Sequence, residues 1–369
     1  MRILLSGGGT AGHINPAVAI AKYAVEKDKN TEVLFVGTKS GLESSLVPKE
    51  GFDIKYVNVS GLKKELSISA MISTAKLGIA VLKSIGILKK FKPDVVVGTG
   101  GYVCVSSVIA AGILDIPTIV HEQNVFPGAA VKFLKNRSTV TAISFDESRE
   151  YLKGANRLSL TGNPIRPDIL KHTAQECKKL LGAEGKKVVL SFGGSLGANK
   201  INDVMIDFLE KHPPKDDTVV YFGTGNREYE RVTEEMKRRG ISAGSNINVL
   251  SYIDNMDVLM NAADVVIGRS GAITLAEMCA IGKAGILIPS PNVTNNHQEY
   301  NARALSDRGA AITILENEFN VDSLSDALSK ILDDEEYARS MRKKSLEMGI
   351  CDATDKIYKL ITELKKQKA

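Results

Sequence analysis

Glycine-rich segments follow short β-branched runs in both halves of the chain. Gly7-Gly8-Gly9-Thr10-Ala11-Gly12-His13 follows residues 3–6, and Gly193-Gly194-Ser195-Leu196-Gly197-Ala198 follows residues 188–192. Glycines let backbone N–H groups and a helix N-terminus approach a ligand closely and stabilise negative charge there. A third segment, residues 269–277, opens with Arg269-Ser270-Gly271 and adds a fixed positive charge suited to a diphosphate. Together the segments predict an anionic ligand, and a tight turn without a ligand is the alternative for each.

The first segment also fits the G-x-G-x-x-G pattern of dinucleotide-binding folds. Such a fold needs an acidic residue at the end of the second strand to hold a ribose. That strand is expected to end at Val36-Gly37-Thr38, which contains no carboxylate. The interpretation as an NAD-binding protein therefore loses its main support.

Several polar side chains near these segments could act on a sugar or a base. His13 is the best-placed general base because an imidazole titrates near neutrality, although a lone histidine at a turn is often structural. Glu277 could accept hydrogen bonds from vicinal ribose hydroxyls, or could simply be favourable near a helix N-terminus. Residues 121–124 and 295–301 contain amides that suit sugar hydroxyls, with turn formation as the alternative. Because the chain contains no Asp-x-Asp motif, helix N-termini and Arg269 would stabilise a diphosphate leaving group.

Composition limits the classes of protein to be considered. With 369 residues, 43% of them hydrophobic, the chain can bury a large core and is expected to form two domains. The net charge of +5 is too small to indicate nucleic acid. Four scattered cysteines indicate reduced thiols rather than a metal site. Without a signal-like N-terminus or an apolar run of about 20 residues, we expect a cytoplasmic protein with at most peripheral membrane contact.

β-branched runs alternate with helical stretches in two successive series, which is typical of parallel sheets covered on both faces. The expected strands are residues 3–6, 33–36, 95–98, 118–121, 140–143, 188–192, 219–222, 249–250, 265–267 and 286–288. Prolines in residues 162–167 mark the boundary between the series. We expect an α/β fold with two doubly wound, Rossmann-like domains at residues 1–163 and 164–350. A C-terminal helix at residues 351–369 is expected to pack back toward the first domain.

Residues 62–92 mix many large apolar side chains with lysines. Read as a helix, Ser69, Ser73, Lys76, Lys83 and Lys90 form one narrow polar stripe. The remaining apolar arc is wider than a helix needs to cover a sheet, so part of it could face lipid. Each lysine would then contribute about 1 kcal/mol against anionic headgroups. The alternative is a buried helix with a solvated lysine edge.

Taken in order along nearly the whole chain, these motifs resemble the MurG family of glycosyltransferases, which have the GT-B fold. The resemblance rests on residues 7–13, 100–102, 121–124, 162–166, 193–198, 269–272 and 298. It implies transfer of N-acetylglucosamine from UDP-N-acetylglucosamine to the C4 hydroxyl of undecaprenyl-diphosphate-N-acetylmuramoyl-pentapeptide, with inversion and without a metal or other cofactor. The family also implies a peripheral position at the cytoplasmic face of the cell membrane, an anionic membrane surface as a partner, and a cell-wall synthesis complex.

The resemblance also assigns roles to individual residues. It implies that the first domain binds the acceptor and the membrane, with His13 as the base, and that the second domain binds the UDP-sugar. Residues that would contact the donor, including Arg269 from the reasoning above, are Thr10, Ala11, Gly12, Asn124, Arg166, Ser195, Ile253, Arg269, Ala272, Ile273, Thr274, Glu277 and Gln298. Among these, Ser195 and Ala272-Ile273-Thr274 would hold the diphosphate and sugar, Ile253 the uracil and Glu277 the ribose. Many members have glycine where this chain has Ala11.

Two other functions are compatible with such a fold. A UDP-N-acetylglucosamine 2-epimerase would need carboxylates and a histidine clustered at the sugar, and no acidic pair is evident in the motifs. A non-catalytic nucleotide-sugar-binding protein would be favoured by loss of His13 or Glu277, and both are present.

Overall fold

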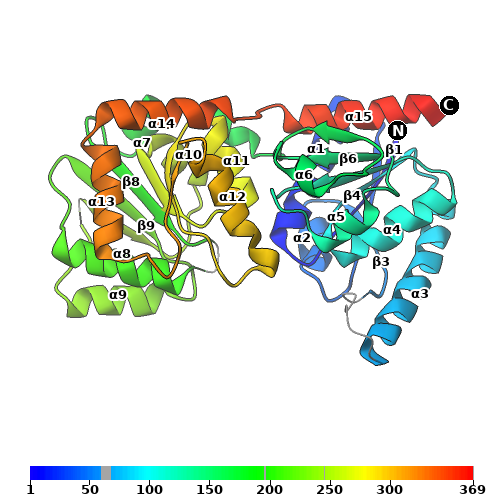
Figure 1. The fold of residues 1–369 in the computed structure, drawn as a ribbon, viewed down its shortest axis with the longest axis horizontal. Helices are drawn as coiled ribbons and strands as arrows, with labels where there is room; N and C mark the ends of the chain where they lie inside the picture. Colours follow the sequence, from blue (N-terminus) through cyan, green and yellow to red (C-terminus); the bar gives the residue numbers. More distant parts are fainter. Residues whose placement is uncertain (60–67, 195–196, 245, 369) are drawn as a thin grey trace. The chain divides into compact units, whose positions relative to one another are not determined.

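The structure is a computed structural model that describes residues 1–59, 68–194, 197–244 and 246–368 (Figure 1). The chain forms two compact units. Unit 1 contains Met1–Ile165 together with Ile350–Ala369, and unit 2 contains Arg166–Gly349. Ser195, a candidate site residue, and residues 62–67 of the lysine-rich stretch lie outside the described residues.

Unit 1 is built on a parallel sheet with the strand order β3-β2-β1-β4-β5-β6-β7. Its strands are β1 (Arg2–Gly7), β2 (Glu32–Gly37), β3 (Asp53–Tyr56), β4 (Val95–Gly100), β5 (Thr118–Glu122), β6 (Val140–Ile143) and β7 (Leu158–Leu160). Its helices are α1 (Ala11–Lys27), α2 (Glu43–Lys49), α3 (Ile68–Phe91), α4 (Gly101–Ile113), α5 (Ala129–Leu134), α6 (Ser148–Tyr151) and α15 (Ala353–Lys368).

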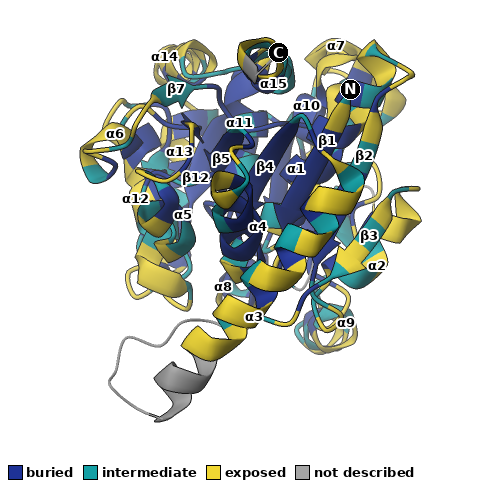
Figure 2. Ribbon diagram, turned by 90° about the vertical axis from the view of Figure 1, so that its right-hand side faces the viewer, coloured by how far each residue is buried: buried dark blue, intermediate teal, exposed yellow. Residues whose placement is uncertain are grey.

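Alternate side chains of β1 and β4 supply two different cores, as the pleat of a strand requires. Ile3 and Leu5 pack with side chains of α1 and α15, whereas Leu4 packs with side chains of α3 and α4. Both faces of the sheet are therefore covered, and its central strands are buried (Figure 2).

The C-terminal helix α15 is part of the unit 1 core. Its apolar stripe, Ile357, Leu360, Ile361 and Leu364, is buried in the same cluster as Ile3 and Leu5. Two polar contacts hold the helix further. The Tyr23 hydroxyl donates to Asp355 Oδ1 at 2.7 Å, and Arg157 pairs with Glu363.

Unit 2 repeats the architecture with the strand order β10-β9-β8-β11-β12-β13, all parallel. Its strands are β8 (Lys187–Phe192), β9 (Thr218–Gly223), β10 (Ile247–Leu250), β11 (Val265–Gly268), β12 (Ala284–Leu287) and β13 (Ile312–Thr313). Its helices are α7 (Ala174–Leu180), α8 (Asn199–Lys211), α9 (Tyr229–Arg238), α10 (Met256–Ala262), α11 (Ala272–Ala280), α12 (His297–Ser306), α13 (Val321–Leu332) and α14 (Glu335–Glu347), with short 3₁₀ turns η1 (Pro167–Leu170) and η2 (Thr294–Asn296). The predicted fold class, two doubly wound parallel-sheet units, is confirmed.

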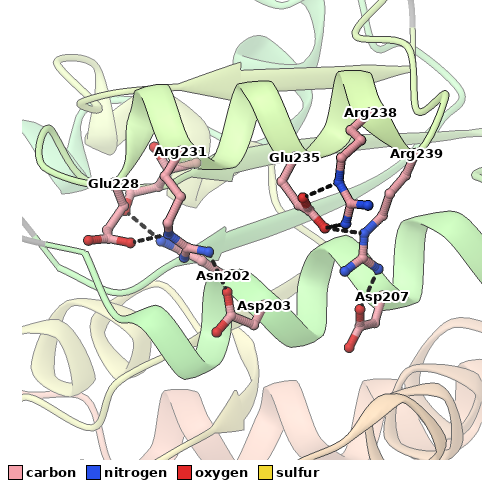
Figure 3. Close-up of polar contacts among 9 residues, drawn as sticks. Asn202, Asp203, Asp207, Glu228, Arg231, Glu235, Arg238 and Arg239 are labelled. Carbon is pink, nitrogen blue, oxygen red and sulfur yellow. Dashed lines mark hydrogen bonds and ion pairs between the residues drawn. The ribbon is translucent and has the colours of Figure 1, made fainter.

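A network of ion pairs on the surface of unit 2 holds α9 against α8 (Figure 3). Arg239 contacts Asp207, Glu210 and Glu235, and Arg231 contacts Asp203. Hydrogen bonds from Arg238 and Arg239 lower the pKa of Glu235 to about 2. Each exposed pair contributes little alone, but a network restrains geometry. It thereby fixes α8, the helix that begins directly after the second glycine-rich segment.

In each sheet the strand order reverses beside the first strand of the unit. This switch point lies between β1 and β4 in unit 1, and between β8 and β11 in unit 2. Ligands of doubly wound sheets bind outside the carboxyl ends of the strands at such a point. Three segments predicted to hold a ligand reach this point: residues 7–10 in unit 1, and residues 193–194 with 197–198 and residues 269–271 in unit 2. Residues 100–101, which carry part of the family resemblance, also lie there in unit 1.

Candidate active site

The first glycine loop joins β1 to α1 at the unit 1 switch point. Gly9 takes a positive φ of 87°, which glycine adopts without strain. Thr10 is the N-cap of α1, and Ala11 and Gly12 form its exposed first turn. The N–H groups of Ala11 and Gly12 have no acceptor within the helix, so they can meet an anion. Ala11 is already helical, and alanine therefore suits this position.

His13 is held against this loop by one contact of its ring and one contact of its main chain. Its Nδ1 lies 3.0 Å from the carbonyl oxygen of Gly8. The Thr99 hydroxyl donates to the His13 carbonyl at 2.7 Å. Because a carbonyl only accepts hydrogen bonds, Nδ1 carries the proton and Nε2 is the basic nitrogen of the neutral ring. A ring with one unprotonated nitrogen, here Nε2, can accept a proton as a general base.

Two further glycines make room for this arrangement. A Cβ atom at Gly100 would lie 2.6 Å from Cδ2 of His13, and one at Gly101 would lie 2.4 Å from the Gly8 carbonyl oxygen. Both glycines also have a positive φ. The turn from β4 into α4 therefore determines where His13 and Gly8 lie.

Asn124 follows β5 and is oriented by the buried Glu122. The Asn124 backbone N–H and side-chain amide donate to Glu122 Oε1 at 2.9 and 3.2 Å, and the Gly128 N–H donates to Oε2 at 2.8 Å. Burial raises the pKa of Glu122 against the opposing effect of these bonds. Asn124 is half-buried at the end of the strand.

His121 and Gln123 hold the segment that leads out of unit 1. Nε2 of His121 donates to the Gly162 carbonyl at 3.0 Å, and the Gln123 amide donates to His121 Nδ1 at 2.9 Å. The side-chain amide of Asn163 donates to the Gln123 carbonyl at 3.0 Å. Burial lowers the pKa of His121 to about 4, so the ring is neutral. These side chains are buried and serve the fold, whereas the sequence suggested sugar contacts for this stretch.

The second glycine loop packs tightly against its neighbours in unit 2. A Cβ atom at Gly193 would lie 2.4 Å from the Ala198 nitrogen, and one at Gly197 would lie 2.2 Å from the Thr224 carbonyl oxygen. Glycine is therefore required at both described ends of the loop. Ser195, between them, is not among the described residues.

The N-terminus of α11 lies at the unit 2 switch point. Gly271 is its N-cap, and the first intrahelical bond runs from the Leu275 N–H to the Gly271 carbonyl at 3.0 Å. The N–H groups of Ile273 and Thr274, which follow Ala272 in the first turn, have no acceptor within the helix. This end of α11 therefore favours a phosphate group.

Glu277, one turn further along α11, forms a bidentate pair with Arg166. Nε of Arg166 lies 2.7 Å from Oε1 and its terminal nitrogen lies 2.7 Å from Oε2. The Glu277 side chain is only 4% exposed, whereas that of Arg166 is 47% exposed. The carboxylate is thus fixed on the helix that carries Ala272, Ile273 and Thr274.

Arg269 and Gln298 connect the loops around α11. Arg269 forms an ion pair with Glu316 and donates to the Ile288 carbonyl at 3.1 Å. Part of its charge is therefore already balanced, which the sequence did not indicate. The side-chain oxygen of Gln298 accepts a hydrogen bond from the Ser290 N–H at 2.9 Å. The main-chain carbonyl of Gln298 accepts one from the Ser270 hydroxyl at 2.7 Å.

Ile253 follows β10 and is buried. Its side chain packs on β9, where a Cβ atom at Gly223 would lie 2.7 Å from Ile253 Cδ1. The side chain therefore anchors the loop, and its main chain is the part that remains for recognising a ligand.

Sequence reasoning missed one residue that contacts the first loop, Glu43. This buried carboxylate at the start of α2 accepts a hydrogen bond from the Gly9 N–H at 3.1 Å. The only signal in the sequence was an acidic residue shortly after the second strand. It was passed over because a dinucleotide-binding fold has its acidic residue at the strand end itself.

The described residues lack two features that would indicate a metal site or a membrane span. Among those residues, no group of three or more histidine, cysteine or acidic side chains is placed to hold a metal ion. Within the same part of the chain, no helix combines the length and apolar character needed to cross a bilayer.

Comparison with known proteins gives consistent matches. The family model for the glycosyltransferase family 28 N-terminal domain matches residues 3–143, and that for the C-terminal domain matches residues 188–359. A UDP-N-acetylglucosamine–N-acetylmuramyl-(pentapeptide) pyrophosphoryl-undecaprenol N-acetylglucosamine transferase of Thermoanaerobacter sp. (strain X514) is 45% identical over 99% of this chain and 100% of its own length. The transferase of the same name from Acetivibrio thermocellus is 42% identical over the full length of both chains.

Solved structures share the fold at lower identity. The crystal structure of Acinetobacter baumannii MurG has a TM-score of 0.80 and 24% identity, covering 98% of this chain and 99% of that one. A UDP-GlcNAc 2-epimerase from Neisseria meningitidis has a TM-score of 0.68 and 14% identity, covering 98% and 100%.

Proposed function

Because this chain belongs to the MurG family within glycosyltransferase family 28, we propose that it completes the lipid-linked disaccharide of peptidoglycan. It transfers N-acetylglucosamine from UDP-N-acetylglucosamine to the C4 hydroxyl of undecaprenyl-diphosphate-N-acetylmuramoyl-pentapeptide. The observation that carries this function is the 45% identity, over 99% of this chain and 100% of the relative, to a transferase of that name.

Unit 2 is proposed to bind the donor. The first turn of α11, at Ala272-Ile273-Thr274, meets the diphosphate and stabilises the charge that grows as UDP leaves. Glu277 accepts hydrogen bonds from the ribose hydroxyls while Arg166 keeps the carboxylate in place, a role supported by the bidentate pair.

The other donor contacts in this proposal are those that the family resemblance implies. Ile253 contacts the uracil through its main chain, and Ser195, Gln298 and Asn124 contact the sugar or its diphosphate. Arg269 acts as part of the loop that precedes α11. Thr10, Ala11 and Gly12 complete the set at the N-terminus of α1.

His13 is proposed to activate the acceptor. As the C4 oxygen forms its bond to the anomeric carbon of the donor, the hydroxyl proton passes to Nε2 of His13. The bond from that carbon to the diphosphate oxygen breaks with its electron pair, and UDP leaves. Attack on the face opposite UDP inverts the anomeric centre. The protonated Nδ1 of the ring, held by the Gly8 carbonyl, supports this assignment.

The outer face of α3 is proposed to contact anionic lipid at the cytoplasmic face of the membrane, where the acceptor is anchored. Much of the described length of α3 is exposed (Figure 2). Ile79 and Leu82 are 64% and 70% exposed, and the neighbouring Lys76 and Lys83 are also exposed. Apolar side chains beside lysines are typical of interfacial helices. Partners in a cell-wall synthesis complex follow from the family and are part of the same proposal.

A transfer assay tests this function. It uses labelled UDP-N-acetylglucosamine, the lipid-linked acceptor and a chelator, and quantifies free UDP and labelled lipid together. Equal amounts of both products are expected. UDP-N-acetylmannosamine without labelled lipid would instead establish an epimerase, for which the Neisseria enzyme provides similarity of fold alone. Binding of UDP without any product would indicate a non-catalytic nucleotide-sugar-binding protein.

A further inference from the structure

Glu43 is a buried carboxylate that none of the roles above uses. Its side chain folds back from the first turn of α2 onto the loop after β1, and the residue is 1% exposed. Oε1 accepts hydrogen bonds from the Thr38 N–H at 2.8 Å and the Thr38 hydroxyl at 2.7 Å. Oε2 accepts one from the Gly9 N–H at 3.1 Å. A single carboxylate therefore joins the loop after β2 to the loop after β1.

The chain leaves a space shaped for this carboxylate. A Cβ atom at Gly8 would lie 2.5 Å from Glu43 Oε1, and one at Gly41 would lie 2.1 Å from Oε2. A Cβ atom at Gly37 would lie 2.5 Å from Glu43 Cγ. Glycine at these three positions thus lets the carboxylate approach the backbone of the first loop directly.

The carboxylate is held in its charged form. Burial alone raises the pKa of Glu43, but the hydrogen bonds from Thr38 and Gly9 outweigh it, and the pKa lies below its usual value. A charged acceptor forms stronger hydrogen bonds than a neutral one.

One peptide plane connects Glu43 to His13. The N–H of Gly9, which donates to Glu43, and the C=O of Gly8, which accepts from His13 Nδ1, belong to the same peptide group. That group is planar, so fixing its N–H also fixes the direction of its carbonyl. A charged acceptor on the N–H also polarises the carbonyl and strengthens its bond to the imidazole.

We propose that Glu43 is a positioning residue that acts on His13 through the Gly8–Gly9 peptide. It holds the ring with the proton on Nδ1, so that Nε2 is the proton acceptor, and it stabilises the imidazolium formed during transfer. The inference rests on the proposed role of His13 as the base. In other enzymes an acid bonded directly to the histidine orients the ring. Here Glu43 would orient the ring of His13 through one intervening peptide group.

A double-mutant cycle tests this coupling. In E43Q the amide oxygen can still accept the two hydrogen bonds from Thr38. The NH₂ group then points toward the Gly9 N–H, and because both are donors, the hydrogen bond to Gly9 is lost. We expect kcat to fall roughly 10- to 100-fold, with the KM for UDP-N-acetylglucosamine within a factor of about 2. S44A is the matched control. It removes a hydroxyl bond to the Gly41 carbonyl in the same turn of α2 without touching Glu43, and should remain near wild-type activity.

The cycle separates positioning from general loosening of the loop. If Glu43 acts through His13, the double variant H13A/E43Q is no slower than H13A, because the second change has nothing left to affect. The inference would be overturned if the fold-losses in kcat of H13A and E43Q multiplied in the double variant, or if E43Q kept full activity. If H13A itself turns over normally, the assignment of the base fails, and this result is distinct from a failure confined to Glu43.

A second measurement does not depend on the folding of any variant at Glu43. The chain has five histidines, so ¹⁵N labelling of histidine with assignment by H13A resolves the ring of His13. The wild-type protein should show the tautomer protonated at Nδ1. The tautomer protonated at Nε2 would contradict the proposed path through the peptide.

Discussion

Replacing Arg166 by methionine should destabilise unit 2 because it leaves a buried carboxylate without its partner. Methionine keeps the apolar stem and removes the guanidinium, which makes two hydrogen bonds of 2.7 Å to Glu277. Hydrogen bonds to charged groups contribute about 1.5–3 kcal/mol each. Since the Arg166 side chain is 47% exposed, water replaces part of this interaction. We expect a net loss of about 2 kcal/mol in the free energy of unfolding.

For a domain of this size that loss corresponds to a fall in Tm of roughly 4–8 °C. Urea unfolding followed by far-UV circular dichroism is the suitable assay, because the chain has no tryptophan. R157M is the matched control. Arg157 also forms a bidentate pair, with Glu363, but both side chains are more than 40% exposed. An exposed pair of this kind contributes between about 0 and 1 kcal/mol.

The double variant R166M/E277Q completes the experiment. If the two side chains interact as described, its loss of stability is smaller than the sum of the single losses by about 1–2 kcal/mol. Equal unfolding midpoints for R166M and R157M would refute the view that Glu277 depends on Arg166.

Three further predictions concern the proposed base and ribose contact, the buried His121 of β5, and the proposed membrane contact. H13A should lower kcat by roughly 10²–10⁴-fold with little change in the Kd for UDP. E277Q should instead weaken UDP binding roughly 10-fold or more. The reverse pattern in steady-state kinetics and calorimetry would overturn both roles. Burial lowers the pKa of His121 to about 4 in the folded protein, against an ordinary 6.5. The unfolded chain therefore binds a proton first as the pH falls. A contribution of roughly 3 kcal/mol to the free energy of unfolding is present above pH 6.5 and is lost as the pH falls toward 4. H121N should lack this part of the pH dependence in urea titrations, and a wild-type-like dependence would contradict it. I79Q/L82Q should bind anionic liposomes at least about 10-fold more weakly than the wild-type protein in flotation assays. The control L180Q, which changes a similarly exposed leucine on α7, should bind like the wild-type protein. Equal binding by the wild-type protein and both variants would remove α3 from the proposal.

The central strands could be predicted from sequence because burial on both faces makes them continuous apolar runs. The edge strands β3, β7 and β13 could not. In β3 exposed residues alternate with half-buried ones, and β13 has only two residues, so neither forms an apolar run. The outer face of α3 was recognised as unusually apolar, and the exposure of Ile79 and Leu82 agrees with that observation.

The backbone geometry of the candidate site was predictable where one segment carries both the strand end and the helix start. This holds for the loops around Gly9 and Gly271, whose backbone N–H groups act locally. It does not hold where the partner is distant in sequence. The pairing of Arg166 with Glu277 spans 111 residues, and Glu43 lies 34 residues from Gly9. Arg269 shows the same limit, because Glu316, which balances its charge, follows β13.

The membership of α15 in the unit 1 core affects how the protein folds during synthesis. Ile357, Leu360, Ile361 and Leu364 each bury a side chain worth about 1.5–3 kcal/mol, and together they approach the whole stability of a typical domain. The ribosome makes these residues after all of unit 2. Unit 1, although its first residues emerge earliest, must therefore wait with an open apolar face while all of unit 2 is translated and folds. Unit 2 is the half that completes its core first, and a variant without α15 would keep the core of unit 2 while the core of unit 1, the half that carries His13, stays incomplete.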